Sequence, residues 1–266
     1  MRHFEYSRPT SLADAQKILR EDPEAKALAG GQSLLPVLRM RLAAPTRLVD
    51  LQDIRELRGV SVRGRTVSIA AMTTHAEIGE SADVQRAAAG LAMLAGGVGD
   101  PMVRNMGTIG GAVANNDPAA DYPGGLLGLD AVVVTTGRRI AAADFFTGLY
   151  ETALEAGELV TAVEFNAPRR AAYAKFRHPA SGFAIVGAFV AETDKGPRVA
   201  ITGAGATAFR VPAYEQALAR SFRPESLAGV SAEFDSLNSD RHAPAEYRAS
   251  LIPEMVRRAL VLALQS

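Results

Sequence analysis

The spacing of apolar residues predicts that the chain opens with a helix followed by two short strands. Apolar positions at helical spacing run from Leu12 to Leu19, and Ser11 precedes them as an N-cap with an acidic residue three positions later. This helix is expected to end near Asp22. Apolar runs at residues 25–29 and 47–50 predict strands, and the first enters a pair of glycines. The N-terminal region is therefore expected to form a small β-α-β-type unit.

From Gly59 onward the apolar period shortens to two, which indicates a β-hairpin. The hairpin is expected over residues 60–69, with its turn at 63–65. A helix capped at Thr73 or Thr74 and an alanine-rich helix over about 84–95 are expected next. The chain therefore combines helices with antiparallel strands and belongs to the α+β class.

The segment from Gly96 to Gly128 has the least regular pattern in the chain. It holds nine glycines and three prolines in 33 residues. Long stretches of this kind in a compact domain are usually functional or disordered. This one is too apolar, and too closely interleaved with strand-like pieces, to be a linker. It is expected to be irregular in structure and functional.

The second half of the chain predicts further strands followed by helices. Residues 131–136 and 159–165 are predicted strands, with a helix near 144–150 between them. A domain boundary is expected at residues 168–170. Three strand-like runs and then two helical segments follow it, at residues 171–176, 183–192, 198–202, 213–221 and 244–264. This order predicts a three-stranded sheet with helices on one face, and Pro253 predicts a kink or restart in the last helix.

Composition removes several classes of function. The 266 residues include no cysteine, which excludes disulfides, thiolate zinc sites and any iron–sulfur cluster held by this chain. The four scattered histidines offer no helical metal pair, so no metal site is expected. The 29 basic and 29 acidic residues balance, which argues against nucleic-acid binding and favours assembly with other chains. A charged N-terminus without a long apolar run predicts a cytoplasmic protein with no integral membrane segment.

The first candidate binding segment is the loop Ala29-Gly30-Gly31-Gln32-Ser33-Leu34. Adjacent glycines after a strand allow positive φ, so successive N–H groups can point inward and bind an anion, with the Ser33 hydroxyl as a further donor. The segment is neither a G-x-G-x-x-G motif nor a P-loop. A tight strand-to-helix turn without a ligand is the alternative.

The second candidate is the segment 104–123, in which small residues dominate. Its backbone can approach a flat or phosphorylated ligand closely, while Thr108, Asn115 and Asp121 offer polar contacts. The alternative is a glycine-rich bulge between strands. Two such loops, about 75 residues apart, would suit a dinucleotide whose diphosphate is held from both sides.

Other residues point less clearly to chemistry. Asp117 and Asp121 could act as paired carboxylates, but capping and hydrogen-bonding roles are commoner. Lys175 lies in a predicted strand, where it either faces a ligand or is a solvated surface lysine. Ser33 and Ser181 have no recognisable histidine and aspartate partners. No catalytic residue is predicted.

Together these segments resemble a known family. Ala29-Gly-Gly-Gln-Ser-Leu34 and Thr108-Ile-Gly-Gly111 are similar to the two FAD-diphosphate motifs of the medium, flavin-binding subunit of the molybdenum hydroxylases, the xanthine dehydrogenase and carbon monoxide dehydrogenase group. The resemblance continues in order over nearly the whole chain. Further matching segments are Arg47–Leu51, Arg104–Asn105, Asp117–Asp121, Gly157–Val160, Tyr173–Arg177, Tyr247–Arg248 and Arg257–Leu260.

The resemblance implies a fold in two domains. Residues 1–168 are expected to form a vanillyl-alcohol-oxidase-type FAD-binding domain, with subdomains at about 1–55 and 56–168. Residues 169–266 are expected to form an α+β domain like the C-terminal domain of CO dehydrogenase flavoproteins, with a three-stranded sheet and helices.

The same resemblance implies which residues bind FAD. Asn115 and Asp121 would contact the adenosine half, and Val160 and Lys175 would lie near the isoalloxazine ring. Gln32 replaces the His or Thr that relatives often carry. The residues of the two diphosphate motifs would be Ala29, Gly30, Gly31, Gln32, Ser33 and Leu34 on one side, and Asn105, Thr108, Ile109, Gly110 and Gly111 on the other.

The family implies a role in electron transfer. The chain would be the FAD-carrying subunit of a heterotrimeric molybdenum hydroxylase that assembles as a dimer of heterotrimers. A small subunit would hold two 2Fe-2S clusters, a large subunit would hold molybdopterin, and electrons would pass through FAD to an external acceptor. A self-contained flavin oxidase or reductase and a cofactor-free scaffold are the alternatives. No motif encodes the substrate of the complex or the final acceptor.

Overall fold

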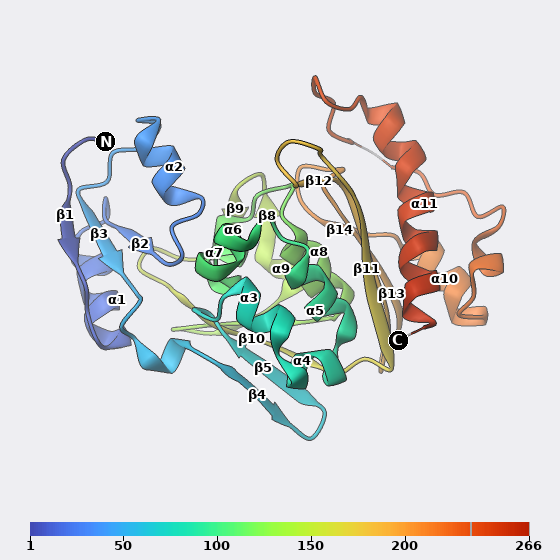
Figure 1. Ribbon diagram of the computed structural model, residues 1–266, viewed down its shortest axis with the longest axis horizontal. Coiled ribbons are helices and arrows are strands. Elements are labelled where there is room, and N and C mark those ends of the chain that lie inside the picture. The colour runs from blue at the N-terminus through green and yellow to red at the C-terminus, as the bar shows by residue number, and fades with distance from the viewer. Residues whose placement is uncertain (235, 266) are drawn as a thin grey trace.

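The N-terminal part of the chain forms a small parallel sheet with a helix against it (Figure 1). The computed structural model describes residues 1–234 and 236–265. The predicted cap is confirmed, because the Ser11 hydroxyl accepts a hydrogen bond from the Asp14 N–H. The sheet has the order β1-β3-β2, and both pairs are parallel. Its elements are β1 (Glu5–Ser7), α1 (Leu12–Glu21), β2 (Lys26–Leu28), α2 (Leu34–Arg39), β3 (Arg47–Asp50) and the 3-10 turn η1 (Arg55–Leu57).

A five-stranded antiparallel sheet forms the middle of the molecule. Its order is β4-β5-β10-β6-β7, so the predicted hairpin β4–β5 pairs with a strand about a hundred residues further along the chain. Val67 and Ile69 are fully buried, while Ser68 between them is only partly buried and faces the other side, as the period of two predicts. The strands are β4 (Val60–Arg63), β5 (Thr66–Ala70), β6 (Val132–Thr135), β7 (Arg139–Ala141) and β10 (Val160–Asn166).

Six helices separate β5 from β6, and they correct two expectations. The single helix expected over 84–95 is two helices, because Ala88 leaves the helical conformation between them. The segment expected to be irregular is helical for most of its length, with Asp100 and Thr108 as side-chain caps. The helices are α3 (His75–Glu80), α4 (Ala82–Ala87), α5 (Ala89–Gly96), α6 (Pro101–Met106), α7 (Ile109–Asn115) and α8 (Asp121–Gly128).

Close packing explains the glycines that suggested an irregular chain. Gly125 and Gly128 lie on α8, and a Cβ on either would come within 2.8 Å of Leu94 or 2.5 Å of Phe189. Glycine at these positions lowers the helix propensity of α8 but allows the helix to pack directly against its neighbours. A local pattern does not report this kind of constraint.

The helix expected near residues 144–150 is also corrected. One helical turn, α9 (Ala142–Phe145), is followed at once by a two-stranded hairpin, β8 (Phe146–Gly148) and β9 (Glu151–Thr152). Asn116, the left-handed C-cap of α7, donates its Nδ2 hydrogens to the carbonyls of Gly148 and Glu151. This contact from a distant residue holds the hairpin, so the local sequence alone does not predict it.

The C-terminal part forms an antiparallel sheet between two groups of helices (Figure 1). The sheet has four strands, not the expected three, because a two-residue strand pairs with β13 at its edge. Helix α11 packs on one face, and α5 and α8 of the middle region pack on the other. The helix continues through Pro253, so the expected restart is wrong, while the kink that was its alternative stays a prediction. The elements are β11 (Arg170–Arg177), β12 (Ala184–Thr193), β13 (Gly196–Thr202), β14 (Phe209–Arg210), α10 (Pro212–Arg220), η2 (Pro224–Leu227) and α11 (Ala245–Ala263).

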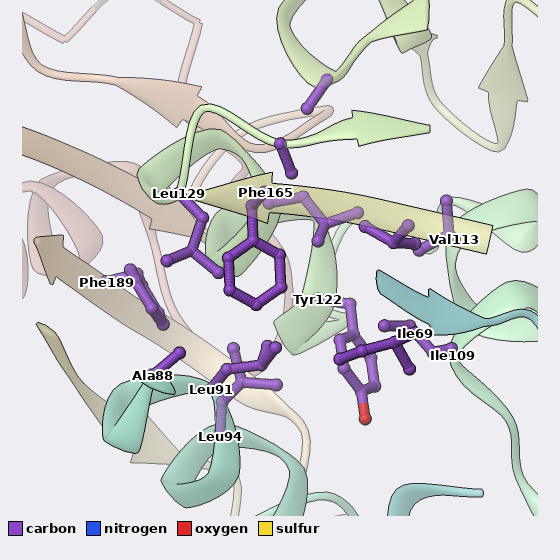
Figure 2. Close-up of a cluster of buried hydrophobic side chains, with 14 of the residues drawn as sticks. Ile69, Ala88, Leu91, Leu94, Ile109, Val113, Tyr122, Leu129, Phe165 and Phe189 are labelled. Carbon is purple, nitrogen blue, oxygen red and sulfur yellow. The ribbon is translucent and has the colours of Figure 1, made fainter. Parts of the chain in front are cut away.

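One hydrophobic core joins the middle region to the C-terminal sheet. Phe189 of β12 is fully buried and lies with Ala88, Leu91 and Leu129 in the same cluster (Figure 2). Since that cluster also contains Phe165, it crosses the boundary expected at residue 168. The two domains of the prediction thus share their packing. Within the described residues, no helix is long and apolar enough to cross a membrane.

The shared core predicts a large and global effect of the substitution Phe189→Ala. Removing this buried ring is expected to lower the free energy of unfolding by about 3–5 kcal/mol, because neighbouring side chains fill the cavity incompletely. Leu42→Ala, at a side chain that is 72% exposed, is the control and is expected to cost less than about 0.5 kcal/mol. Chemical denaturation followed by circular dichroism measures both. A loss near that of the control would show that the two regions are not joined through Phe189.

Candidate functional site

The two glycine-containing loops meet, as the sequence predicts. A Cβ on Gly30 would lie 2.0 Å from the carbonyl oxygen of Met106 and 2.7 Å from the Cα of Gly107. Both contacts are with backbone, which cannot swing aside as a flexible side chain can. Only glycine therefore fits at position 30 while the loops remain in contact.

The first loop offers free backbone donors. Gly31 has a φ of 71°, and the chain turns there into α2. In the part of the chain that the structure describes, the backbone N–H groups of residues 30–33 donate no hydrogen bond. The side-chain Nε2 of Gln32 donates to the Gly30 carbonyl at 3.2 Å. The Ser33 side chain makes no capping bond. Unpaired, adjacent N–H groups are the means by which a loop binds an anion.

The second loop has a different role from the first. The N–H groups of Ile109 and Gly110 donate to the carbonyls of Thr73 and Ala71, and that of Gly111 donates to the Thr108 hydroxyl. A Cβ on Gly110 would also come within 2.5 Å of Ala71. These amides are already paired within the protein. The second loop therefore supplies backbone that packs closely against the first loop, while the first loop supplies the free N–H donors.

A groove runs along these loops. Its larger part has a volume of about 630 Å³, and its narrower part adds about 170 Å³. Both volumes together fall within the range of roughly 300–1,000 Å³ typical of small-molecule sites. Five residues line both parts and so mark where they join, namely Gln32, Ser33, His75, Ala112 and Asn115. The free amides of the first loop thus lie at the middle of an elongated site.

The narrow end of the groove holds a buried ion pair. Lys175 Nζ lies 2.7 Å from Asp121 Oδ2, and their side chains are only 6% and 5% exposed. The Tyr173 hydroxyl donates to Asp121 Oδ1 at 2.5 Å. Burial raises the pKa of Asp121, while the Lys175 ammonium and the Tyr173 hydroxyl oppose that rise. Lys175 is therefore not the solvated surface lysine of the alternative reading.

This contact brings together two residues that were expected at opposite halves of the cofactor. Asp121 was expected at the adenosine half and Lys175 at the isoalloxazine ring, but the two side chains touch and lie at the same end of the groove. Val160, expected beside Lys175, lines the larger part instead. Which half of the cofactor each of these residues contacts stays a prediction.

The remaining predicted residues lie at varied distances from the groove. Leu34, Thr108, Gly111 and Asn115 line it. The residues that do not line it are Ala29, Asn105, Ile109 and Gly110. Ala29 is half-buried, the exposed Asn105 side-chain amide donates to the Pro101 carbonyl, and Ile109 is fully buried in the core. Direct contact of these four with a ligand stays a prediction.

Two residues of the groove were missed by the sequence reasoning. His75 follows the predicted cap Thr74, and its Nδ1 lies 3.1 Å from the buried Tyr122 hydroxyl. Tyr150 adopts a left-handed φ of 56° in the hairpin turn, and its hydroxyl donates to Asp117. Asp117 is thus paired with a tyrosine and not with a second carboxylate.

Among described side chains, no group of three or more His, Cys, Asp or Glu could hold a metal ion.

The comparisons with known proteins agree with this geometry. A family described as the FAD binding domain in molybdopterin dehydrogenase matches residues 2–168. This chain belongs to that family. The carbon monoxide dehydrogenase medium chain of Afipia carboxidovorans is 36% identical over 97% of this chain and 95% of its own length. The nicotine 6-hydroxylase medium subunit of Paenarthrobacter nicotinovorans is 36% identical over 96% and 95%.

Solved structures extend the likeness to the C-terminal sheet and helices. Reconstituted CO dehydrogenase from Oligotropha carboxidovorans matches with a TM-score of 0.91 and 33% identity over 98% of both chains. Quinoline 2-oxidoreductase from Pseudomonas putida 86 matches with a TM-score of 0.91 and 29% identity over 99% of this chain and 98% of that one. The predicted α+β FAD-binding fold, the family and the oxidoreductase class are confirmed. The domain boundaries stay a prediction.

The buried His75 predicts a pH dependence of stability. Burial, reinforced by the nearby Arg104, lowers its pKa from 6.5 to about 4. Between these values the unfolded chain binds a proton that the folded chain does not, so stability falls as the pH drops from 6.5 toward 4. His75 is expected to account for roughly 3 kcal/mol of that fall.

The variant His75→Gln isolates this contribution. Denaturation at several pH values is expected to show a shallower loss of stability for His75→Gln than for the unchanged protein. His3→Gln, at an exposed histidine, is the control and is expected to keep the full slope. Equal slopes for all three proteins would mean that His75 takes up its proton in the folded state as easily as in the unfolded one.

Proposed function

We propose that this chain binds FAD in the groove and serves as the electron-transferring flavin subunit of a multi-subunit molybdenum hydroxylase. The observation that supports this most directly is the set of unpaired N–H groups at residues 30–33, at the middle of the groove. The two negative charges of a diphosphate are the natural partner of such donors. FAD, when bound, supplies the redox chemistry, so the chain needs no acid or base of its own for the transfer.

The residues around the groove fit such a cofactor along its length. The amides of residues 30–33 would hold the diphosphate, and Gly111 would allow the backbone to approach it. We assign the isoalloxazine ring to the narrow end, where Val98, Val103 and Phe183 provide apolar surface beside the buried ion pair. The adenosine half then lies in the larger part, near Val160.

The partners follow from the family and from composition. The similar chains are called medium chains or medium subunits, and a chain without cysteine cannot itself hold an iron–sulfur cluster. We infer that a small subunit with 2Fe-2S clusters and a large subunit with molybdopterin complete the enzyme, as a dimer of heterotrimers in the cytoplasm. Electrons would then pass from the small subunit through FAD to an external acceptor.

Co-expression of the chain with the subunits encoded beside it tests this proposal. The purified complex is expected to contain one FAD per chain, measured from the visible spectrum and from chromatography of the heat-released cofactor, together with iron and molybdenum. A flavin-containing chain that oxidises a substrate alone would favour the self-contained oxidase. A folded, colourless chain would favour the scaffold and overturn the proposal.

The substitution Gly30→Ala tests the contact between the loops. The added Cβ would push against backbone, so stability is expected to fall by roughly 1–3 kcal/mol and FAD content to fall with it. Gly96→Ala, at the end of α5 with no atom within 4 Å of the new Cβ, is the matched control and is expected to keep full FAD content. Full FAD content in both variants would show that the loop contact does not shape the site.

A further inference from the structure

A tyrosine lies behind the buried ion pair without reaching the groove itself. Asp121 and Lys175 line the narrow end, whereas Tyr173 does not and is only 5% exposed. Among the described residues, Asp121 is the hydrogen-bond partner of the Tyr173 hydroxyl, at 2.5 Å. The carboxylate is therefore held from two directions, by an ammonium at Oδ2 and by a phenol at Oδ1.

The neighbouring strand leaves room for this hydroxyl. Gly187 of β12 stands opposite Lys175 in the sheet. A Cβ at this position would lie 2.2 Å from the Tyr173 hydroxyl and 2.9 Å from Thr202 Cγ2. Any side chain at position 187 would force the hydroxyl away from Asp121. Glycine thus leaves out a side chain at a buried position of β12, and the Tyr173 hydroxyl occupies the space.

We propose that Tyr173 is a positioning residue that holds Asp121 as a carboxylate against Lys175, so that the cofactor faces a neutral ion pair and not an isolated charge. The inference rests on the proposed FAD site. A hydrogen bond donated to a carboxylate favours its charged form. Without the phenol, Asp121 accepts a proton at higher pH, and Lys175 is then left as an uncompensated positive charge. Such a charge beside a flavin favours the reduced form, which carries more negative charge.

The other charged groups near Asp121 are few. Arg177, further along β11, also favours the carboxylate. Tyr122 of α8 and His75 of α3 form their own hydrogen-bonded pair beside it. The helices α5 and α7, which pack against α8, have no titratable side chain. Tyr173 and Lys175 are thus the groups in direct contact with the carboxylate.

The reduction potential of the flavin, measured against pH by spectroelectrochemistry on the flavin-loaded chain, tests the proposal. Asp121→Asn provides a permanently neutral reference. Below a certain pH, the potential becomes equal to that of Asp121→Asn, because Asp121 has then taken up its proton. We call this value the merging pH. In Tyr173→Phe this pH is expected to rise by roughly one to two units relative to the unchanged protein, because a hydrogen bond to a charged group is lost.

Two further variants make the test decisive. Tyr214→Phe removes the hydroxyl of another mostly buried tyrosine, one that makes no hydrogen bond within the described chain, and is expected to leave the merging pH unchanged. Gly187→Ala, which displaces the Tyr173 hydroxyl, is expected to raise the merging pH as Tyr173→Phe does, so a misfolded Tyr173→Phe would not end the test. A merging pH that is the same in all of them, or a potential shifted equally at every pH, would overturn the inference. Failure of the unchanged chain to bind FAD would instead overturn the proposed function.

Discussion

The groove depends on the close approach of two backbone segments that are far apart in the sequence. The contact of Gly30 with the backbone of Met106 and Gly107 fixes the first loop against the second. In this arrangement the first loop keeps its N–H groups free, while those of Ile109 and Gly110 anchor the second loop to Thr73 and Ala71. One loop is thus a rigid support and the other is a set of donors, and the site needs both.

The shared hydrophobic core has a second consequence for the site. Asp121 begins α8 in the middle region, and Lys175 lies on β11 of the C-terminal sheet. These elements are held together by the packing around Phe189, so the two charges meet in a place from which water is largely excluded. A buried charge is costly unless it is paired and hydrogen-bonded. The ion pair with its tyrosine satisfies that condition at the end of the groove that we assign to the flavin.

The sequence predicts those features that are set by neighbouring residues. The Ser11 cap, the β4–β5 hairpin, β3 and the glycine loop all depend on signals within a few positions, and the structure has them where they were expected. The overall fold is predicted by the family resemblance and not by local patterns, because a series of motifs in order along the chain specifies more than local propensity does. The convergence of the two loops was predicted from their small residues and from the way two such loops can hold a diphosphate from both sides.

Features that depend on distant partners were missed or misjudged. Helix α8 looks irregular in sequence because its glycines Gly125 and Gly128 allow close packing against Leu94 and Phe189, and Gly110 of α7 likewise allows a close approach to Ala71. This packing overrides helix propensity. The burial of Lys175 could not be read from β11, because its partner lies 54 residues away. The hairpin β8–β9 likewise depends on Asn116.

Hydrogen exchange of the loop amides, followed by NMR on the chain with and without FAD, tests the central claim most directly. The amides of Gly31, Gln32 and Ser33 are expected to exchange rapidly without FAD and roughly tenfold or more slowly with it, because a bound diphosphate would occupy them. Those of Ile109 and Gly110, which are already paired, are expected to be protected in both states. Unchanged exchange at residues 31–33 in a chain that holds FAD would contradict the account, because the cofactor would then be bound elsewhere.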